Sequence, residues 1–302
     1  MIQELARPVL EAARNIQFNL KLLDDKKNEF DAKPINQNDS VIPHVELIRE
    51  PLQYPRTVCT NSTCVKYVKT REFDVIDYST VCHDPYYLRN VKHDTINNPA
   101  IQSCEIMTLA TKQCRKRKCP WNYHMHISYR TKQEVHYEVI KGQVGVDPGR
   151  ELVKRMKALR EEQETLIKIS AVLIQFLKTN SITAFNDPFI DYMNYFVNEE
   201  RLKHSMGANN QYVLNGLEKL KGLYLQKLQS PMNPSKKDIS DLLETLYNLL
   251  FNGSSIKDQV NSIKNIQVKE IEKNEKLIYA HQQPEKDIIV TKLNALFSNS
   301  RN

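Results

Sequence analysis

The stretch that decides the architecture is KQCRKRKCPWNYHMHISY, residues 112–129. It holds two cysteines, Cys114 and Cys119, followed by His124 and His126 on alternate positions of a strand-like run. Thiolate and imidazole hold zinc best, and strand residues two apart face the same side, so both imidazoles could meet one ion. The stretch therefore predicts a metal site in the middle of the chain.

The other candidate ligands lie in the same third of the chain. All six cysteines fall between residues 59 and 119, and Cys59 and Cys64 repeat the spacing of Cys114 and Cys119. Two thiols separated by a short turn can face one ion, so each pair is typical of a slightly long zinc knuckle. The candidate metal ligands are Cys59, Cys64, Cys82, His83, Cys104, Cys114, Cys119, His124 and His126. One tetrahedral site uses four ligands and two use eight, so we expect one or two structural Zn2+ ions.

These residues also have interpretations without metal. A cysteine is often a small buried hydrophobe, and this alternative is strongest for Cys104, which falls in a predicted short helix near residues 98–111. Cys82 and His83 are adjacent, and usually only one of two such neighbours can ligate a given ion. His93 and His136 are expected to be ordinary surface or strand residues.

Composition favours long helices over a compact α/β enzyme. The 302 residues include only 7 glycines, which tight βα turns require, and 26% are charged. The net charge of +7 can attract acidic surfaces or nucleic acid. We find no apolar run long enough to span a membrane and no secretory signal, so we expect a cytoplasmic protein with reduced thiols. A disulfide-bonded secreted protein is the alternative.

Periodicity divides the chain into three predicted parts. Residues 1–35 contain an N-terminal amphipathic helix, residues 36–146 form a Cys/His-rich β module entered through a linker at 33–43, and residues 147–302 form a helical coiled-coil-like and bundle region. One face of the first helix carries Leu5, Val9, Ala12, Ile16, Asn19, Leu23 and Phe30.

Helix start signals recur in the third part. Asp147-Pro148 and Asp187-Pro188 each combine an N-cap with proline at the first helical position, and Ser235 with Asp238 has the form of a capping box. A seam of coiled-coil spacing runs through Leu152, Met156, Leu159, Gln163, Leu166, Ser170, Leu173 and Leu177. Further helices are predicted at 209–229, 236–251, 255–280 and 284–297.

The predicted fold is mainly α, with long antiparallel helical arms flanking a small β-rich Cys/His zinc module, followed by a C-terminal helical bundle. The first helix and the helix at 148–178 have matching lengths and seams. The simplest arrangement is therefore an antiparallel pair with the module at its tip. The alternative is that each seam packs on the C-terminal helices.

The sequence contains no motif that predicts catalysis. We find no HExxH, no zinc-deaminase signature, no phosphate-binding loop and no nucleophile elbow, and Cys-rich zinc sites are mostly closed and structural. The basic residues Lys112, Arg115, Lys116, Arg117 and Lys118 lie beside Trp121 and Tyr123. They could bind single-stranded nucleic acid, or form a solvated loop whose charges offset bound thiolates. We favour the solvated loop.

The order of the cysteines and histidines, ending in CPWNYHMHISY at 119–129, resembles a eukaryotic family. It is similar to the uncharacterised Cys/His-rich region that follows the AIG-type P-loop G domain in large GTPase-like proteins, and ELARPVLEAARNIQ at 4–17 is similar to the helix by which that region leaves the G domain. The resemblance covers residues 1–180. It implies a G-domain partner in cis or trans and no catalytic residues. Family cysteines are expected where this chain has Tyr86 and Arg117, so the resemblance puts one of two metal sites in doubt.

These observations predict a zinc-stabilised helical interaction or regulatory region of a GTPase-like protein, with no activity of its own. We expect a protein partner or self-association through the helical seams, and no membrane. The alternative is a zinc-dependent nucleic-acid-binding protein that uses the basic loop 112–118.

Overall fold

A computed structural model describes residues 2–32, 41–69, 74–77, 81–83, 98–139, 148–181, 187–230 and 232–265. The chain divides into two compact units, residues 1–258 and 259–302. Every helix and strand with two defined ends belongs to the first unit. His93, Tyr86, Asp147 and the helix expected at 284–297 lie outside the described residues.

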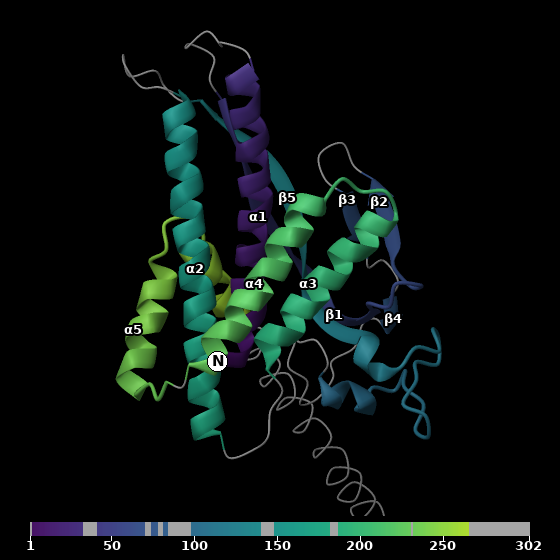
Figure 1. Cartoon of the computed structure of the whole chain (residues 1–302). Helices are drawn as coiled ribbons and strands as arrows, with labels where there is room; N and C mark the ends of the chain where they lie inside the picture. The colour runs from purple at the N-terminus through teal and green to yellow at the C-terminus, as the bar shows by residue number, and fades with distance from the viewer. Residues whose placement is uncertain are drawn as a thin grey trace, which may run out of the picture. The chain divides into compact units, whose positions relative to one another are not determined.

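The α-helices begin and end close to where the sequence predicts. They are α1 (Ile2–Ala32), α2 (Pro148–Asn180), α3 (Pro188–Ser205), α4 (Gln211–Gln229) and α5 (Lys236–Tyr247), and a further helical segment begins at 253 (Figure 1). The Asp187 carboxylate accepts from the first backbone N–H groups of α3, and Ser235 with Asp238 forms a capping box on α5. Both predicted helix starts are therefore confirmed.

A three-stranded antiparallel sheet has the order β4-β1-β5, with β1 (Val41–Cys59), β4 (Val81–His83) and β5 (His124–Val139). The register of β1 and β5 runs from Val41 opposite Val139 to Cys59 opposite His124, with a shift between Pro51 and Arg56. A separate ribbon pairs β2 (Lys66–Lys69) with β3 (Asp74–Asp77). The sheet register therefore brings the end of β1 beside the start of β5.

Helix α1 is the centre of the first unit. It contacts α2, β1, α3 and α4. The predicted face is buried at Leu5, Val9, Ile16 and Leu23, but residues on the other sides, such as Leu10, are buried as well. A helix that is buried on several sides packs against several elements instead of a single seam.

The predicted arrangement of long antiparallel helical arms flanking a small module is therefore wrong. The chain is mainly helical, but β1 has 19 residues and β5 has 16, and they pair along most of their length. β1 also packs against α1, and α3 and α4 cover α1, so the helices expected in a separate bundle share its core. Pro43, Pro51 and Pro55 concealed β1, because proline within a run argues against a strand.

Smaller differences have local causes. β1 begins at Val41, inside the predicted linker, and the helix expected near 98–111 is the 3₁₀-helix η2 (Pro99–Ser103) followed by turns. The α2 seam packs into a mixed core and not into a coiled coil. Gln163, one of its polar interruptions, donates to the carbonyl of Ala13 and accepts from Gln17. In the described helices there is no stretch long and apolar enough to cross a membrane.

Buried polar residues join α1 to its neighbours. Asn19 accepts from the backbone N–H of Val45 at 2.7 Å and donates to its carbonyl, to which Asn15 also donates. In the described chain, this part of β1 pairs with a strand on one side only, which is β5. The contacts with α1 therefore satisfy backbone hydrogen-bonding groups of β1. Asn19, the polar residue on the apolar face of α1, therefore makes hydrogen bonds of the kind that a neighbouring strand would make.

Candidate metal centre

The centre lies where β1 ends and β5 begins. Cys59 is the last residue of β1 and faces His124, the first residue of β5, across the sheet. The backbone N–H of Thr60 donates to the carbonyl of Tyr123, which extends the pairing into the turn that carries Cys64. The β-strand register therefore brings the first cysteine pair beside the residues that follow the second pair.

The first group of candidate ligands consists of Cys59, Cys64 and Cys119. One ligand atom from each lies within 4.8 Å of the others. The sulfur atoms of Cys64 and Cys119 are 3.5 Å apart. Three sulfur atoms at this separation can all contact one ion, because Zn–S bonds are about 2.3 Å long.

The second group consists of Cys82, Cys114 and His124, which also lie within 4.8 Å of one another and are all buried. Cys82 comes from β4 and His124 from β5. Cys114 lies in the turn between Met107 and Pro120, where the Cys114 N–H donates to the Cys119 carbonyl. Three chain segments far apart in sequence therefore supply one group.

His124 is oriented as a metal ligand. Its Nδ1 lies 3.0 Å from the carbonyl of Pro120, and a carbonyl can only accept, so Nδ1 carries the proton. The other nitrogen, Nε2, then bears a lone pair. It is buried and has no hydrogen-bond partner among the described residues. His124 is thus fixed through one nitrogen and lies within reach of two thiols, and metal-binding histidines are commonly held in this way by a carbonyl.

Backbone N–H groups are directed at several sulfur atoms. The N–H of Arg117 donates to Cys114 Sγ at 3.3 Å, and the backbone N–H groups of Asn61 and Ile106 act to lower the pKa of Cys59 and of Cys104. Such bonds favour the thiolate. Burial disfavours the thiolate and is the larger effect. It raises the pKa of the Cys59 thiol, and it raises the pKa of Cys82 to about 12. A cation is the partner that would stabilise these thiolates despite their burial.

Sulfur forms most of the interior of this part of the molecule. The buried cluster contains few side chains other than thiols: it consists of Cys59, Cys82, Ile101, Cys104, Met107, Cys114 and Cys119, with Trp121 packed against it. All six cysteines are free thiols. So small an apolar core is a weak source of stability, and small domains of this kind use a metal instead.

The remaining predicted ligands lie beside the two groups without belonging to either. His83 Nδ1 is 3.3 Å from Cys104 Sγ, and His126 Nδ1 is 3.1 Å from the hydroxyl of Thr57. Cys104 belongs to the same buried cluster as Cys82 and Cys114, and the charge of Cys114 acts to raise its pKa. The sequence indicated neither Thr57 nor Pro120, because hydroxyl and carbonyl support of a ligand has no spacing signature.

The spacing predicts that each cysteine pair faces one ion, and the structure brings the two thiols of only one pair into the same group. Cys59 and Cys64 do meet, but Cys114 and Cys119 lie in different groups. The turn between these two includes Lys118 at a φ of 61°, in the left-handed region. In the structure the second knuckle therefore divides its two sulfur atoms between neighbouring groups.

The basic loop lies on the outside of this centre. Arg115, Lys116 and Lys118 are exposed, and Lys116 Nζ donates to the carbonyl of Val81 on β4. Of the two aromatic residues, Trp121 packs against the sulfur cluster and Tyr123 is 43% exposed. The loop therefore presents cations with one available ring.

Comparison with protein families finds one match. Residues 51–130 match a family model described as a domain of unknown function (DUF8206). The matched stretch contains every candidate ligand, from Cys59 to His126. No curated protein and no solved structure matches the chain.

Proposed function

We propose that the two groups bind zinc, one ion each, and that the metal-stabilised module belongs to a non-catalytic interaction region. The observation that carries the proposal is the convergence of five cysteines and His124 into two groups of three ligands. Buried thiols and a neutral imidazole form the ligand set that zinc prefers over calcium or magnesium. Cys104 is the further thiol that could complete the second group.

A structural role for the metal follows from the same chemistry. Cys-rich zinc sites are mostly closed, whereas a hydrolytic site keeps one position for water and has a general base nearby. The second group is buried, and its histidine is fixed by a backbone carbonyl and not by a carboxylate. These features favour stabilisation over catalysis.

The interaction role requires a surface other than the helical seams. Residues of the seams, such as Leu5 and Leu152, are buried within this chain. Two large apolar side chains, Leu109 and Leu250, are instead 84% and 80% exposed. We propose that contacts with a partner use such exposed positions. The proposal that the partner is a G domain rests on the sequence resemblance alone, and a pull-down with a purified AIG-type G domain tests it.

Nucleic-acid binding is the second candidate, and the exposed cations of the basic loop support it. Stacking of bases needs exposed rings, and the packing of Trp121 against the sulfur cluster leaves Tyr123 as the ring beside the loop. We therefore favour a protein partner. Salt-dependent binding of a single-stranded RNA that Arg115→Glu with Arg117→Glu abolishes would favour the second candidate.

Metal content measured by native mass spectrometry tests the proposal. We expect two zinc ions per chain. Cys59→Ser with Cys64→Ser should remove one ion, and Cys82→Ser with His124→Ala should remove the other. His136→Ala is the matched control, because His136 is on the same strand outside both groups and should leave both ions bound. A wild-type chain that is folded without metal would overturn the proposal.

A further inference from the structure

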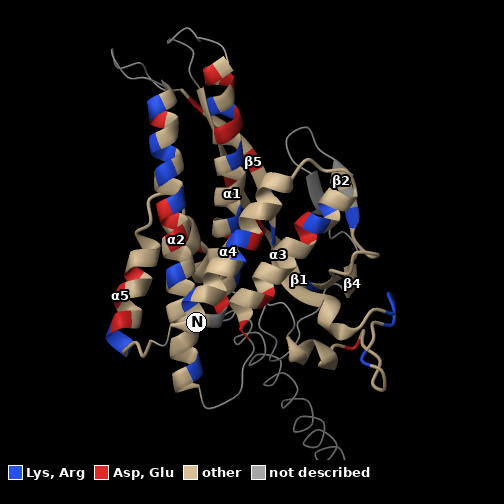
Figure 2. Ribbon diagram, in the orientation of Figure 1, with Lys and Arg blue, Asp and Glu red and all other residues tan. Residues whose placement is uncertain are grey.

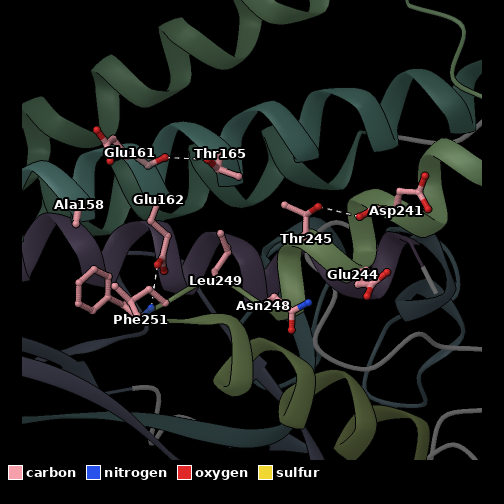
Figure 3. A pocket seen from close by; sticks show the side chains of 11 residues that line it. Ala158, Glu161, Glu162, Thr165, Asp241, Glu244, Thr245, Asn248, Leu249 and Phe251 are labelled. Carbon is pink, nitrogen blue, oxygen red and sulfur yellow. Dashed lines mark hydrogen bonds between the residues drawn. The ribbon is translucent and has the colours of Figure 1, made fainter.

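A groove lies between α2 and α5, away from the metal centre. Its volume is about 710 Å3. It is lined by four residues of α2, Ala158, Glu161, Glu162 and Thr165, and by Asp241, Glu244, Thr245, Asn248, Leu249, Leu250 and Phe251. Figure 3 shows Glu161 and Thr165 on one side and Asp241, Glu244 and Thr245 on the other. Glu162 joins α2 to the segment that follows α5, because its carboxylate accepts hydrogen bonds from the backbone N–H groups of Phe251 and Asn252.

The groove is acidic although the chain carries a net charge of +7. Asp241 and Glu244 are exposed on α5, and Figure 2 shows acidic residues in red on this helix. Glu161 lies 3.7 Å from Lys157, so its charge is partly offset. Asp241 and Glu244 form no ion pair with any residue that the structure describes. These two carboxylates therefore provide a negative edge that is available to a cation.

The groove also has an unburied apolar residue. Leu250 is 80% exposed, next to the half-buried Leu249 and Phe251. Arg155 lies over the Phe251 ring, but its charge is paired with Glu138. An exposed apolar side chain at the edge of a hollow that also carries two exposed carboxylates is typical of a contact site for a cationic and partly apolar segment.

The same chain carries such a segment. The cationic loop, which we define as Lys112, Arg115, Lys116 and Lys118, is joined to Leu109, whose side chain is 84% exposed. Lys112 and Lys118 both have positive φ, at 53° and 61°. An L-residue in this region is strained, and strain concentrates at functional sites. The loop is therefore opposite to the groove in charge, and like the groove it has an exposed leucine.

We propose that the acidic groove binds the cationic loop of a second copy of this chain, so that copies associate head to tail. The inference rests on the proposed interaction function and names its partner. Among the described residues, Leu109 and Leu250 are the most exposed large apolar side chains, and this contact would cover both. Because the two surfaces differ, an assembly of any length keeps one unused groove at one end and one unused loop at the other, so the association is open-ended.

Sedimentation velocity of the full chain at low salt, over a range of concentrations, tests this. The wild-type chain should show a mass that grows with concentration and falls as salt is added, because exposed charges are screened. The groove variant, Asp241→Lys with Glu244→Lys, and the loop variant, Arg115→Glu with Lys118→Glu, should each stay monomeric. Asp25→Lys with Glu29→Lys on α1 makes the same charge change elsewhere and should associate like the wild type.

Mixing the two variants gives the sharpest result. The groove variant keeps an intact loop and the loop variant keeps an intact groove, so an equal mixture should form dimers that grow no further. Loss of the leucines through Leu109→Ser or Leu250→Ser should raise the apparent dissociation constant about tenfold.

Several results would overturn the inference. These are a wild-type chain that stays monomeric at every concentration, a groove variant that associates like the wild type, or association that nuclease treatment removes. A cationic peptide that binds the groove of a monomeric wild-type chain would likewise assign the groove to another protein. Zinc content measured on the same samples separates these failures from failure of the metal proposal.

Discussion

At the scale of single residues, the polar side chains of α1 determine how the helix joins the sheet. Asn19 donates to the carbonyl of Val45 and accepts from its N–H, and both residues are buried. Removing one partner of a buried hydrogen bond leaves the other without water or protein to bond. The contribution of Asn19 is therefore larger than that of an exposed polar residue on the same helix.

Asn19→Ala should lower the free energy of unfolding by about 1–3 kcal/mol, because the backbone N–H of Val45 loses its acceptor and the Val45 carbonyl keeps only Asn15 as a side-chain donor. Asn28→Ala is the control, since Asn28 is exposed near the end of the same helix. It should change stability by less than about 0.5 kcal/mol. Urea denaturation followed by circular dichroism measures both, and equal losses would show that the Val45 contact contributes nothing specific.

A second buried residue, Glu200, links stability to pH. It is fully buried and accepts from Arg14, Lys203 and Asn210. Burial by itself would raise the pKa of this carboxyl, but Arg14 and Lys203 outweigh it and hold the pKa below its ordinary value. A carboxyl with a lowered pKa stabilises the fold above its unfolded pKa, and this contribution is lost as the pH falls through the folded value.

Glu200→Gln should therefore cost about 3–5 kcal/mol at neutral pH, because it leaves buried cations short of a carboxylate. The difference from the wild type should shrink as the pH falls below about 4.5, the ordinary glutamate range. Glu218→Gln, at an exposed ion pair with Arg201, should cost at most about 1 kcal/mol. Denaturation at neutral and acidic pH measures this. A difference that stays constant with pH would contradict the assigned role of the charge.

At the scale of elements, the contact of α4 with α1 depends on a missing side chain. A Cβ at Gly216 would lie 1.9 Å from Gln17 Oε1 and 2.4 Å from its Cδ. Gln17 is buried and donates to Gln163 of α2, so it cannot simply move into solvent. Gly222, on the same helix, has nothing within 4 Å of the corresponding position. The two glycines therefore differ in packing while sharing the same helix.

Gly216→Ala should destabilise the protein by about 1–3 kcal/mol through overpacking. Gly222→Ala should stabilise it by about 0.5–1 kcal/mol, because alanine favours the helix and meets no obstacle. Thermal unfolding of both variants should move the midpoint in opposite directions. Adding Gln17→Ala to Gly216→Ala should recover part of the loss. Stabilisation by both alanines would show that α4 is less closely packed on α1 than the structure indicates.

At the scale of the whole molecule, local signals were predictable from the sequence and long-range pairings were not. Proline and capping residues marked the start of α3 and α5, and apolar spacing gave the extent of α1. Tertiary contacts decided the rest: Arg14 meets partners on α3 more than 180 positions away, and β1 pairs despite its prolines. The ligand types were evident, but their division between two groups depended on strand register.

The molecule has two buried clusters of different composition, one around α1 and one around the candidate metal centre. Their difference predicts how the molecule responds to loss of metal. The core around α1 is built on many large apolar side chains, whereas the cluster around the candidate centre consists largely of thiols. Removing zinc should therefore loosen the second and leave the first intact. Trp121, the only tryptophan of the chain, packs against the thiol cluster and reports on it alone.

A strong chelator should shift the fluorescence of Trp121 to longer wavelength while the helical circular dichroism signal changes little. Zinc should restore the fluorescence and magnesium should not, because thiolates bind soft or borderline cations. The variant Cys82→Ser with His124→Ala should already show part of the shift before any chelator is added. If chelation instead removed all helical signal in one transition, the metal would stabilise the whole first unit, and the α1 core would depend on thiol ligation that lies outside it.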